Sequence, residues 1–325
     1  MAKIFGLMAV MTAVVLLATG CVKQPAEVLK NMNAKMAETT TYDYNMVMSA
    51  AMSGIPGTTV DTNVTATVDG KVDMKDDKVA QSMNMKIDVS SEGMLISADG
   101  NLVATPEMLY AKLNTVPNLG LFDLSAIKGT WFKFDLAKLT QGAKAGEKVD
   151  LQKLTADQKA LAKKIWENTK LITVVKDFGV EKLDNVGKAY HYQVKINKDE
   201  AEKMIKEMYV LMEKKDFTAD EVIQLQTALA NLDTANIEIW VGYKDYYIYK
   251  MTFAMDMNIE SATAKLKLTA NFANFNKPVA IEIPADAQEF NPAALMGGAT
   301  VNPEPVTDLP TGESIYLTVP PTPKN

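Results

Sequence analysis

Apolar and polar residues alternate with a period of two between residues 237 and 283, which predicts β-strands. Three long runs have an apolar residue at every second position, at 237–241, 251–259 and 266–272. A shorter run of the same kind follows at 279–283. We expect these four runs to form an antiparallel meander with one apolar face and one solvated face.

The same alternation predicts further strands that extend this sheet. Asp69-Gly70 lies at the end of one of them and predicts a bend or bulge, Asp76-Asp77 predicts a turn, and Asp99-Gly100 predicts a hairpin turn. The additional strands are expected at 42–52, 60–68, 83–89, 108–113, 131–136, 171–183 and 188–196.

Helical spacing of apolar residues predicts helices that cover the apolar face of the sheet. Pro25 suits a first helical turn, and two capping boxes begin at Thr155 and Thr218. The chain is therefore expected to have an α+β fold. The helices are expected at 25–37, 156–168 and 198–232.

The first 21 residues have the pattern of an export signal that ends in a cysteine. Lys3 precedes an apolar core, and small residues lead to Cys21, the only cysteine of the chain. This segment resembles bacterial lipoprotein signals, in which the cysteine is acylated after cleavage. We expect a signal peptide at 1–20 and a lipidated tether at 21–24, which would anchor an extracytoplasmic protein to the bacterial cell membrane or outer membrane through a palmitate-type lipid on Cys21. The alternative is an ordinary signal peptide followed by a lone buried or free thiol.

The composition argues against nucleic-acid binding. All 34 basic residues are lysines, and the formal net charge is −6. Arginine, whose planar fork grips phosphate and guanine, is absent from the sequence. Seven of the 13 prolines lie in residues 291–325, which we expect to be a disordered tail.

The sequence offers little that would support catalysis. His191 is the only histidine, and alternation places it on the solvated side of a strand. No nucleophile-elbow motif and no zinc spacing is present, and the aspartates near 69–77 do not match an EF-hand loop. We therefore expect no enzyme, no metal and no cofactor, while weak calcium binding at the acidic turn and a glycosidase-type carboxylate pair stay open.

Methionine is the unusual component, because seventeen of the 20 methionines lie after residue 20 and many occupy the alternating apolar positions. One interpretation is core filler. A second is a pliable lining for a cavity that accepts flexible acyl chains. Copper binding is a third interpretation, but clustered Met-x-x-Met motifs are missing.

Several stretches resemble the lipid-carrier group of bacterial envelope proteins that includes the mycobacterial lipoproteins LppX, LprA, LprF and LprG, with the carrier LolA and the stress regulator RseB more distant. They are PAEVLKNMNAKMAETTTYDY at 25–44, GTWFKFDL at 129–136, GVEKLDNVGKAYHYQVKIN at 179–197, and the closing sheet at 237–285. The resemblance implies a strongly curved antiparallel sheet, a half-barrel, wrapped around helices in one domain at 25–290. The insertion at 198–232 is longer than expected for the group.

The function that this resemblance implies is binding or transfer of lipids or acylated molecules in an apolar cavity, without catalysis. An alternative is a protein-binding envelope sensor or regulator, or a structural surface lipoprotein, on the same fold. The expected partners are thus a lipid or acylated ligand, the membrane through Cys21, and in the alternative an envelope protein. The expected cavity lining, from alternation, is Met46, Met48, Val64, Met83, Met85, Phe253, Met255, Leu266 and Leu268.

Overall fold

The computed structural model describes residues 23–54, 61–75, 79–91, 93–115, 127–136, 155–259 and 262–290. The predicted signal peptide, Cys21 and the proline-rich tail lie outside these described residues, as does the predicted turn at Asp76-Asp77.

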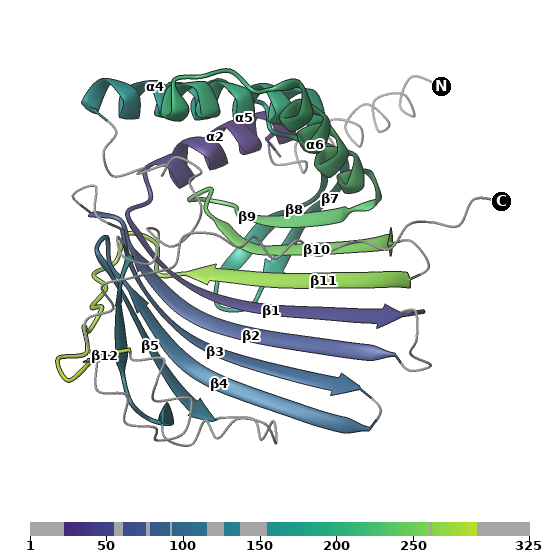
Figure 1. Ribbon diagram of the computed structural model, residues 1–325. Coiled ribbons are helices and arrows are strands. Elements are labelled where there is room, and N and C mark those ends of the chain that lie inside the picture. Colours follow the sequence, from purple (N-terminus) through teal and green to yellow (C-terminus); the bar gives the residue numbers. More distant parts are fainter. Residues whose placement is uncertain are drawn as a thin grey trace, which may run out of the picture.

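A single sheet of twelve strands carries the described part of the chain (Figure 1). The strands are β1 (Thr41–Ser53), β2 (Thr62–Asp73), β3 (Ala80–Ser91), β4 (Met94–Ala104), β5 (Met108–Thr115), β6 (Phe132–Asp135), β7 (Ile172–Leu183), β8 (Gly187–Ile196), β9 (Asn236–Gly242), β10 (Ile248–Ile259), β11 (Ala262–Ala273) and β12 (Gln288–Glu289). Their order across the sheet is β12-β6-β5-β4-β3-β2-β1-β11-β10-β9-β8-β7. Neighbours are antiparallel, except that β12 runs parallel to β6.

The sheet is open and strongly curved, and the helices lie inside the curve (Figure 1). Alternation sets this arrangement, because successive side chains of a strand point to opposite faces. In β10, for example, Met251 and Phe253 pack toward the helices, while Lys250 lies on the outer face over the Trp240 ring. The predicted α+β fold, with a curved antiparallel sheet around helices, is confirmed.

Within the described residues, four α-helices and a short 3₁₀ helix form the inner layer. Two capping boxes fix helix starts as predicted, because Gln158 N donates to Thr155 Oγ1 at 3.2 Å and Glu221 N donates to Thr218 Oγ1 at 3.3 Å. α4 contacts both α2 and α5, and α6 packs on α5. The helices are α2 (Pro25–Ala37), α4 (Ala156–Asn168), α5 (Lys198–Glu213), α6 (Ala219–Ala230) and the 3₁₀ helix η4 (Asn231–Thr234).

The densest packing lies between α2 and the strands β8, β9 and β10. Val28 and Met32 of α2 are 0% and 2% exposed, and they belong to one buried cluster with Tyr190, Tyr192 and Ile239. The apolar core of the described chain is therefore concentrated in one half of the curve.

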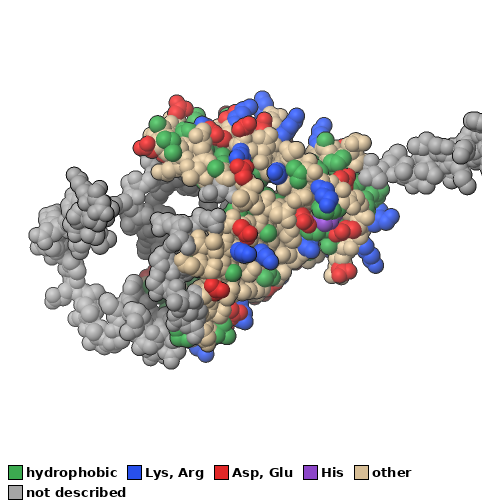
Figure 2. Space-filling view, turned by 90° about the vertical axis from the view of Figure 1, so that its right-hand side faces the viewer, with side chains coloured by type: hydrophobic (Ala, Val, Ile, Leu, Met, Phe, Trp, Pro, Cys, Tyr) green, Lys and Arg blue, Asp and Glu red, His purple; other side chains and the backbone are tan. Residues whose placement is uncertain are grey.

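Lysine and acidic side chains are interspersed over the surface in Figure 2, with no large area of one sign.

One predicted turn and one predicted bend or bulge are wrong. Asp99-Gly100 lies inside β4, where the register with β5 shifts, rather than in a hairpin turn. The hairpin between β3 and β4 contains Gly93 instead, at a φ of 77°. Asp69-Gly70 also lies within a regular strand, because β2 continues to Asp73.

The fourth strand predicted at 279–283 is also wrong. β11 already has β1 and β10 as neighbours, so it has no free edge, and Pro278 and Pro284 lack the N–H that a ladder needs. Residues 274–290 instead form a strap that runs from β11 to β12 past the left-hand end of the sheet in Figure 1. Asn276 N donates to Thr41 O at 2.8 Å at its start, and Gln288 N donates to Trp131 O at 2.9 Å at its end.

Candidate functional site

The nine residues predicted to line a cavity all lie on the inner, helix-facing side of the sheet. The register shows this, because side chains directly opposite one another in neighbouring strands share a face. Met46 lies opposite Val68, which lies opposite Met85, while Met48 lies opposite Leu268, which lies opposite Phe253. Val64, Met83, Met255 and Leu266 fall on the same face by the same pairings.

The inner face has a covered half and an open half. Met255 is 9% exposed and belongs to the cluster under α2, and Phe253 packs against that cluster. Met48 of β1 is 39% exposed, and Ile96 of β4 is 38% exposed. The predicted lining thus spans both halves, and its part on β1, β2 and β3 lies outside the buried cluster.

The open half is apolar across several strands. Along one row, Leu266 lies opposite Ala50, Ala50 opposite Val64, and Val64 opposite Val89. These side chains are half-buried in the described structure. Such a surface can take up an apolar chain without first breaking hydrogen bonds, because its side chains make none.

Aromatic residues outside the predicted lining close one end of the open half. The ring centroid of Tyr42 lies 6.1 Å from Phe272 and 6.3 Å from both Tyr44 and Phe275. Tyr44 is 7% exposed, and its burial raises the pKa of its hydroxyl. The signal that could have found this group is the density of Tyr and Phe at 42–44 and 272–275.

A polar group also lies deep in the covered half. Tyr192 is fully buried, and within the described residues its hydroxyl has no hydrogen-bond partner. Its burial raises the pKa well above the ordinary value for tyrosine. The hydroxyl therefore stays protonated at physiological pH and is a buried donor on the inner face.

His191 lies on the outer face, as alternation predicted, but it is packed rather than free. Its ring is stacked between Trp240, at 4.1 Å between centroids, and Phe178, at 4.3 Å. Its Nε2 lies 2.9 Å from Glu238 Oε2, and its Nδ1 lies 3.3 Å from Glu181 Oε2. The side chain is 12% exposed. Its contacts link β7, β8 and β9 at one edge of the sheet.

The described residues also bear on metal binding and on membrane crossing. In the stretches that the structure describes, no group of three or more His, Cys, Asp or Glu side chains is placed to hold a metal ion. Over the same stretches, no helix combines the length and apolarity needed to cross a bilayer.

A family model described as a family of unknown function, DUF6612, matches residues 28–291. The chain belongs to the DUF6612 family. Its match covers most of the domain predicted at 25–290 and includes every residue of the predicted lining. No curated protein matches this DUF6612 chain.

Several solved structures share weak similarity with this DUF6612 protein. A DUF1329 family protein from Desulfovibrio piger is 9% identical, with 80% of this chain and 96% of that chain covered and a TM-score of 0.23. A LolA superfamily protein from Nitrosomonas europaea is 7% identical, with 80% and 96% covered and a TM-score of 0.17. MucB in complex with MucA, from Pseudomonas aeruginosa, is 6% identical, with 76% and 93% covered and a TM-score of 0.11. The predicted resemblance to LolA-like proteins reappears in this set, but at these scores it supports neither a ligand nor a partner for the DUF6612 chain.

Proposed function

We propose that this protein is an extracytoplasmic lipoprotein, anchored through Cys21, that binds lipids or acylated molecules on the inner face of its sheet. The observation that carries the proposal is the open apolar half of that face. There, Met46, Met48, Val64, Met83 and Met85 stay half-buried or exposed outside the cluster that α2 covers. A water-soluble protein normally covers so broad an apolar surface, unless the surface binds something.

The proposed mechanism is transfer of burial and involves no bond chemistry. Moving one methylene of an acyl chain from water into an apolar site lowers the free energy by about 0.8 kcal/mol. A long acyl chain bound on this face would therefore be stabilised enough to cross the water between two membranes. Methionine suits this task because its unbranched thioether repacks around chains of different length. Without arginine, headgroup contacts would come from lysine, tyrosine, asparagine and backbone groups.

The two faces of β1 provide a matched test. Met48 on the inner face and Val47 on the outer face are neighbours, and they are 39% and 40% exposed. In a soluble Cys21→Ser background, we expect Met48→Glu to weaken uptake of a fluorescent acyl probe by tenfold or more, because the charge must be desolvated beside the acyl chain. Val47→Glu should leave uptake within twofold of the parent.

Lipid that co-purifies with the same Cys21→Ser protein should be detectable by mass spectrometry. Protein that is consistently empty and takes up no probe would overturn the proposal. Equal loss of uptake in both glutamate variants would also overturn it, since the inner face would then have no special role.

The second candidate is a protein-binding envelope regulator, and the β7 edge of the sheet favours it. β7 is the last strand at this side, and its Val175, Phe178 and Val180 are 48%, 42% and 36% exposed. An edge strand can add a strand from another protein. Crosslinking in cells that captures one stoichiometric protein at β7, with no lipid in the purified protein, would support this function in place of lipid binding.

A further inference from the structure

A single row of side chains crosses the outer face of the sheet and links its strands. Lys250 lies opposite Asn271, Asn271 opposite Asn45, and Asn45 opposite Asp69. The register then continues from Asp69 through β3 and β4 to β5. A lysine lies over a tryptophan ring at each end of the row. Lys112 Nζ lies 5.0 Å from the ring centroid of Trp131, the residue before β6. At the other end, Lys250 Nζ lies 4.4 Å from the ring centroid of Trp240. We call this row the amide ladder; it reads Trp240, Lys250, Asn271, Asn45, Asp69, Asn84, Asn101, Lys112 and Trp131.

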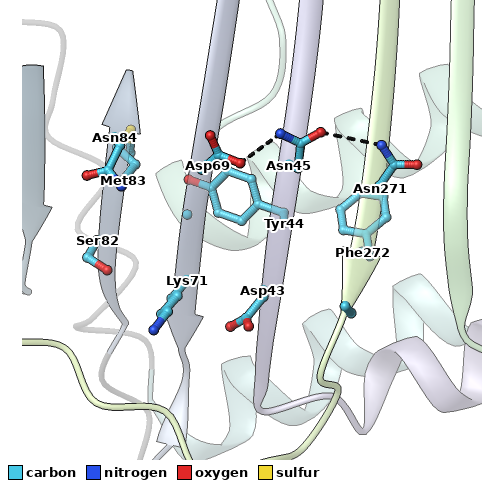
Figure 3. A pocket seen from close by; sticks show the side chains of 12 residues that line it. Asp43, Tyr44, Asn45, Asp69, Lys71, Ser82, Met83, Asn84, Asn271 and Phe272 are labelled. Atoms are coloured by element: carbon cyan, nitrogen blue, oxygen red, sulfur yellow. Dashed lines mark hydrogen bonds between the residues drawn. The ribbon is translucent and has the colours of Figure 1, made fainter. Parts of the chain in front are cut away.

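Hydrogen bonds join the amides of the ladder. Asn45 Nδ2 donates to Asp69 Oδ1 at 2.7 Å, and Asn271 Nδ2 donates to Asn45 Oδ1 at 3.4 Å, as Figure 3 shows. From the other side, Asn101 donates to Asn84, and Asn114 Nδ2 donates to Asn101 Oδ1 at 2.8 Å. Both sets of donors point toward the centre of the row, where Asp69 is the only carboxylate.

Two hollows follow the ladder, one on each side of it. The first has a volume of about 370 Å³, and Figure 3 shows its two walls, with Asn84, Asp69, Asn45 and Asn271 in one row and Ser82, Lys71 and Asp43 in the other. The second has a volume of about 500 Å³ and continues over β2 to β5. Its polar lining is Thr67, Asp69, Asn84, Lys86, Asp99, Asn101 and Asn114.

The chemistry of these walls selects a ligand rich in hydroxyl and amide groups. An asparagine side chain has two N–H donors and an oxygen with two lone pairs, so each amide that uses one donor within the ladder keeps a donor and an acceptor for a ligand. Asp69 adds an acceptor, and Trp131, which is half-buried, adds part of an aromatic face beside Lys112. Trp240 is 5% exposed under its stack and marks the end of the row without offering a free face.

The spacing of the ladder selects an extended ligand over a compact one. Neighbouring strands lie about 4.8 Å apart, so the polar side chains of the row repeat at that step from β11 to β5. A small metabolite meets only two or three of them, whereas a linear polysaccharide presents polar groups along its whole length. Nucleic acid is disfavoured because seven of the row's nine members are neutral or acidic and arginine is absent from the sequence.

We propose that the outer face binds a linear, amide-bearing or hydroxyl-bearing glycan along the amide ladder, with the sugar chain lying across the strands in the two hollows. This site is on the opposite face from the proposed lipid surface and does not depend on it.

The probes are three insoluble linear glycans: chitin, cellulose and purified peptidoglycan sacculi. We expect the full chain carrying Cys21→Ser to be retained by at least one of them, equally at low and high salt because the ladder contacts are mostly uncharged. Asn84→Ala combined with Asn101→Ala should weaken retention at least tenfold. The matched control is Asn63→Ala combined with Ser90→Ala, a neighbouring pair on β2 and β3 that faces outward but lies outside both hollows.

Circular dichroism and thermal melting check that the variants fold. If the double ladder variant does not fold, Asn114→Ala at the end of the hydrogen-bonded row decides, with an expected loss of about threefold because one ligand hydrogen bond is removed. No retention on any of the three glycans would overturn the proposal, as would equal retention of ladder and control variants. Sedimentation velocity tests whether the face is instead an interface between copies of this chain. If the protein self-associates and the ladder variant changes its sedimentation coefficient, the proposal is overturned.

Discussion

Gly70 shows how a single residue shapes the inner face. A Cβ at Gly70 would collide with the ring of Tyr44 on the neighbouring strand, so the glycine lets the ring lie flat across β2. The sequence pattern suggested a bend at Asp69-Gly70, because glycine in a strand often marks one. Close approach of an aromatic ring is the other physical reason for such a glycine, and it cannot be distinguished from a bend without the partner strand.

We expect Gly70→Ala to lower the free energy of unfolding by about 1–3 kcal/mol, since the methyl group overpacks the site. Urea denaturation measures the change. In a Tyr44→Ala background the ring is absent, and the same Gly70→Ala substitution should then cost little. An equal cost in both backgrounds would show that the Tyr44 ring is not the cause.

The element scale explains why most of the secondary structure is predictable. The boundaries of α2, α4 and α6 rest on local signals, namely a first-turn proline and two capping boxes, and each signal lies within four residues of the helix it starts. Strand interiors are equally local, because alternation needs only one strand. Turns and strand pairings do not depend on local signals alone. Asp99-Gly100 has a typical turn sequence, but the pairing of β4 with β5 keeps it inside a strand.

The cap of α6 predicts a pH dependence of stability. Glu221 accepts hydrogen bonds from the backbone N–H and the hydroxyl of Thr218, and these bonds hold the pKa of its carboxyl below the ordinary 4.5. A lowered pKa in the folded state adds stability above the pKa of the unfolded state, and this stability is lost as the pH falls through the folded value. We expect wild type to exceed Glu221→Gln in unfolding midpoint at pH 7.

The difference between wild type and Glu221→Gln should shrink once the pH falls below about 4.5, where the unfolded carboxyl is protonated. Chemical denaturation from pH 7 to pH 3 measures it. A difference that stays constant over this range would show that the carboxylate charge does not act through the cap.

At the scale of the whole molecule, the inner apolar face was predictable and the amide ladder was not. Alternation alone assigned Met46, Met85 and Met255 to one face, and the register agrees. The ladder joins residues as distant in sequence as Asn45 and Asn271, and nothing local marks them as partners. Their alignment depends on the register of each strand between them, which is a property of the assembled sheet.

The strap connects distant parts of this sheet, and its end can be tested. The Phe290 ring lies 5.6 Å from Phe132 and 5.2 Å from Phe134 between centroids, next to the short pairing of β12 with β6. We expect Phe290→Ala to release this end, so that amides of β6 exchange hydrogen at least tenfold faster. Amides of β8 and β9, which belong to the cluster under α2, should keep their protection.

Native-state hydrogen exchange read by mass spectrometry measures both regions in one experiment. Faster exchange in β6 and β9 alike would mean that the sheet opens as one cooperative unit, which would contradict a local role for the strap.

The pairing of β1 with β11 also sets the order in which this chain can fold. β1 lies near the start of the chain, and its second neighbour is made only when residues 262–273 have been synthesised. Until then, one side of β1 is an unpaired edge. Val28 and Met32 in turn depend on β8, β9 and β10, more than 150 residues further along the chain, for their burial. Pairings of such long sequence separation form slowly. The nascent protein therefore passes through an interval in which its apolar face and an open edge are exposed together, and it is during this interval that aggregation or proteolysis competes most strongly with folding.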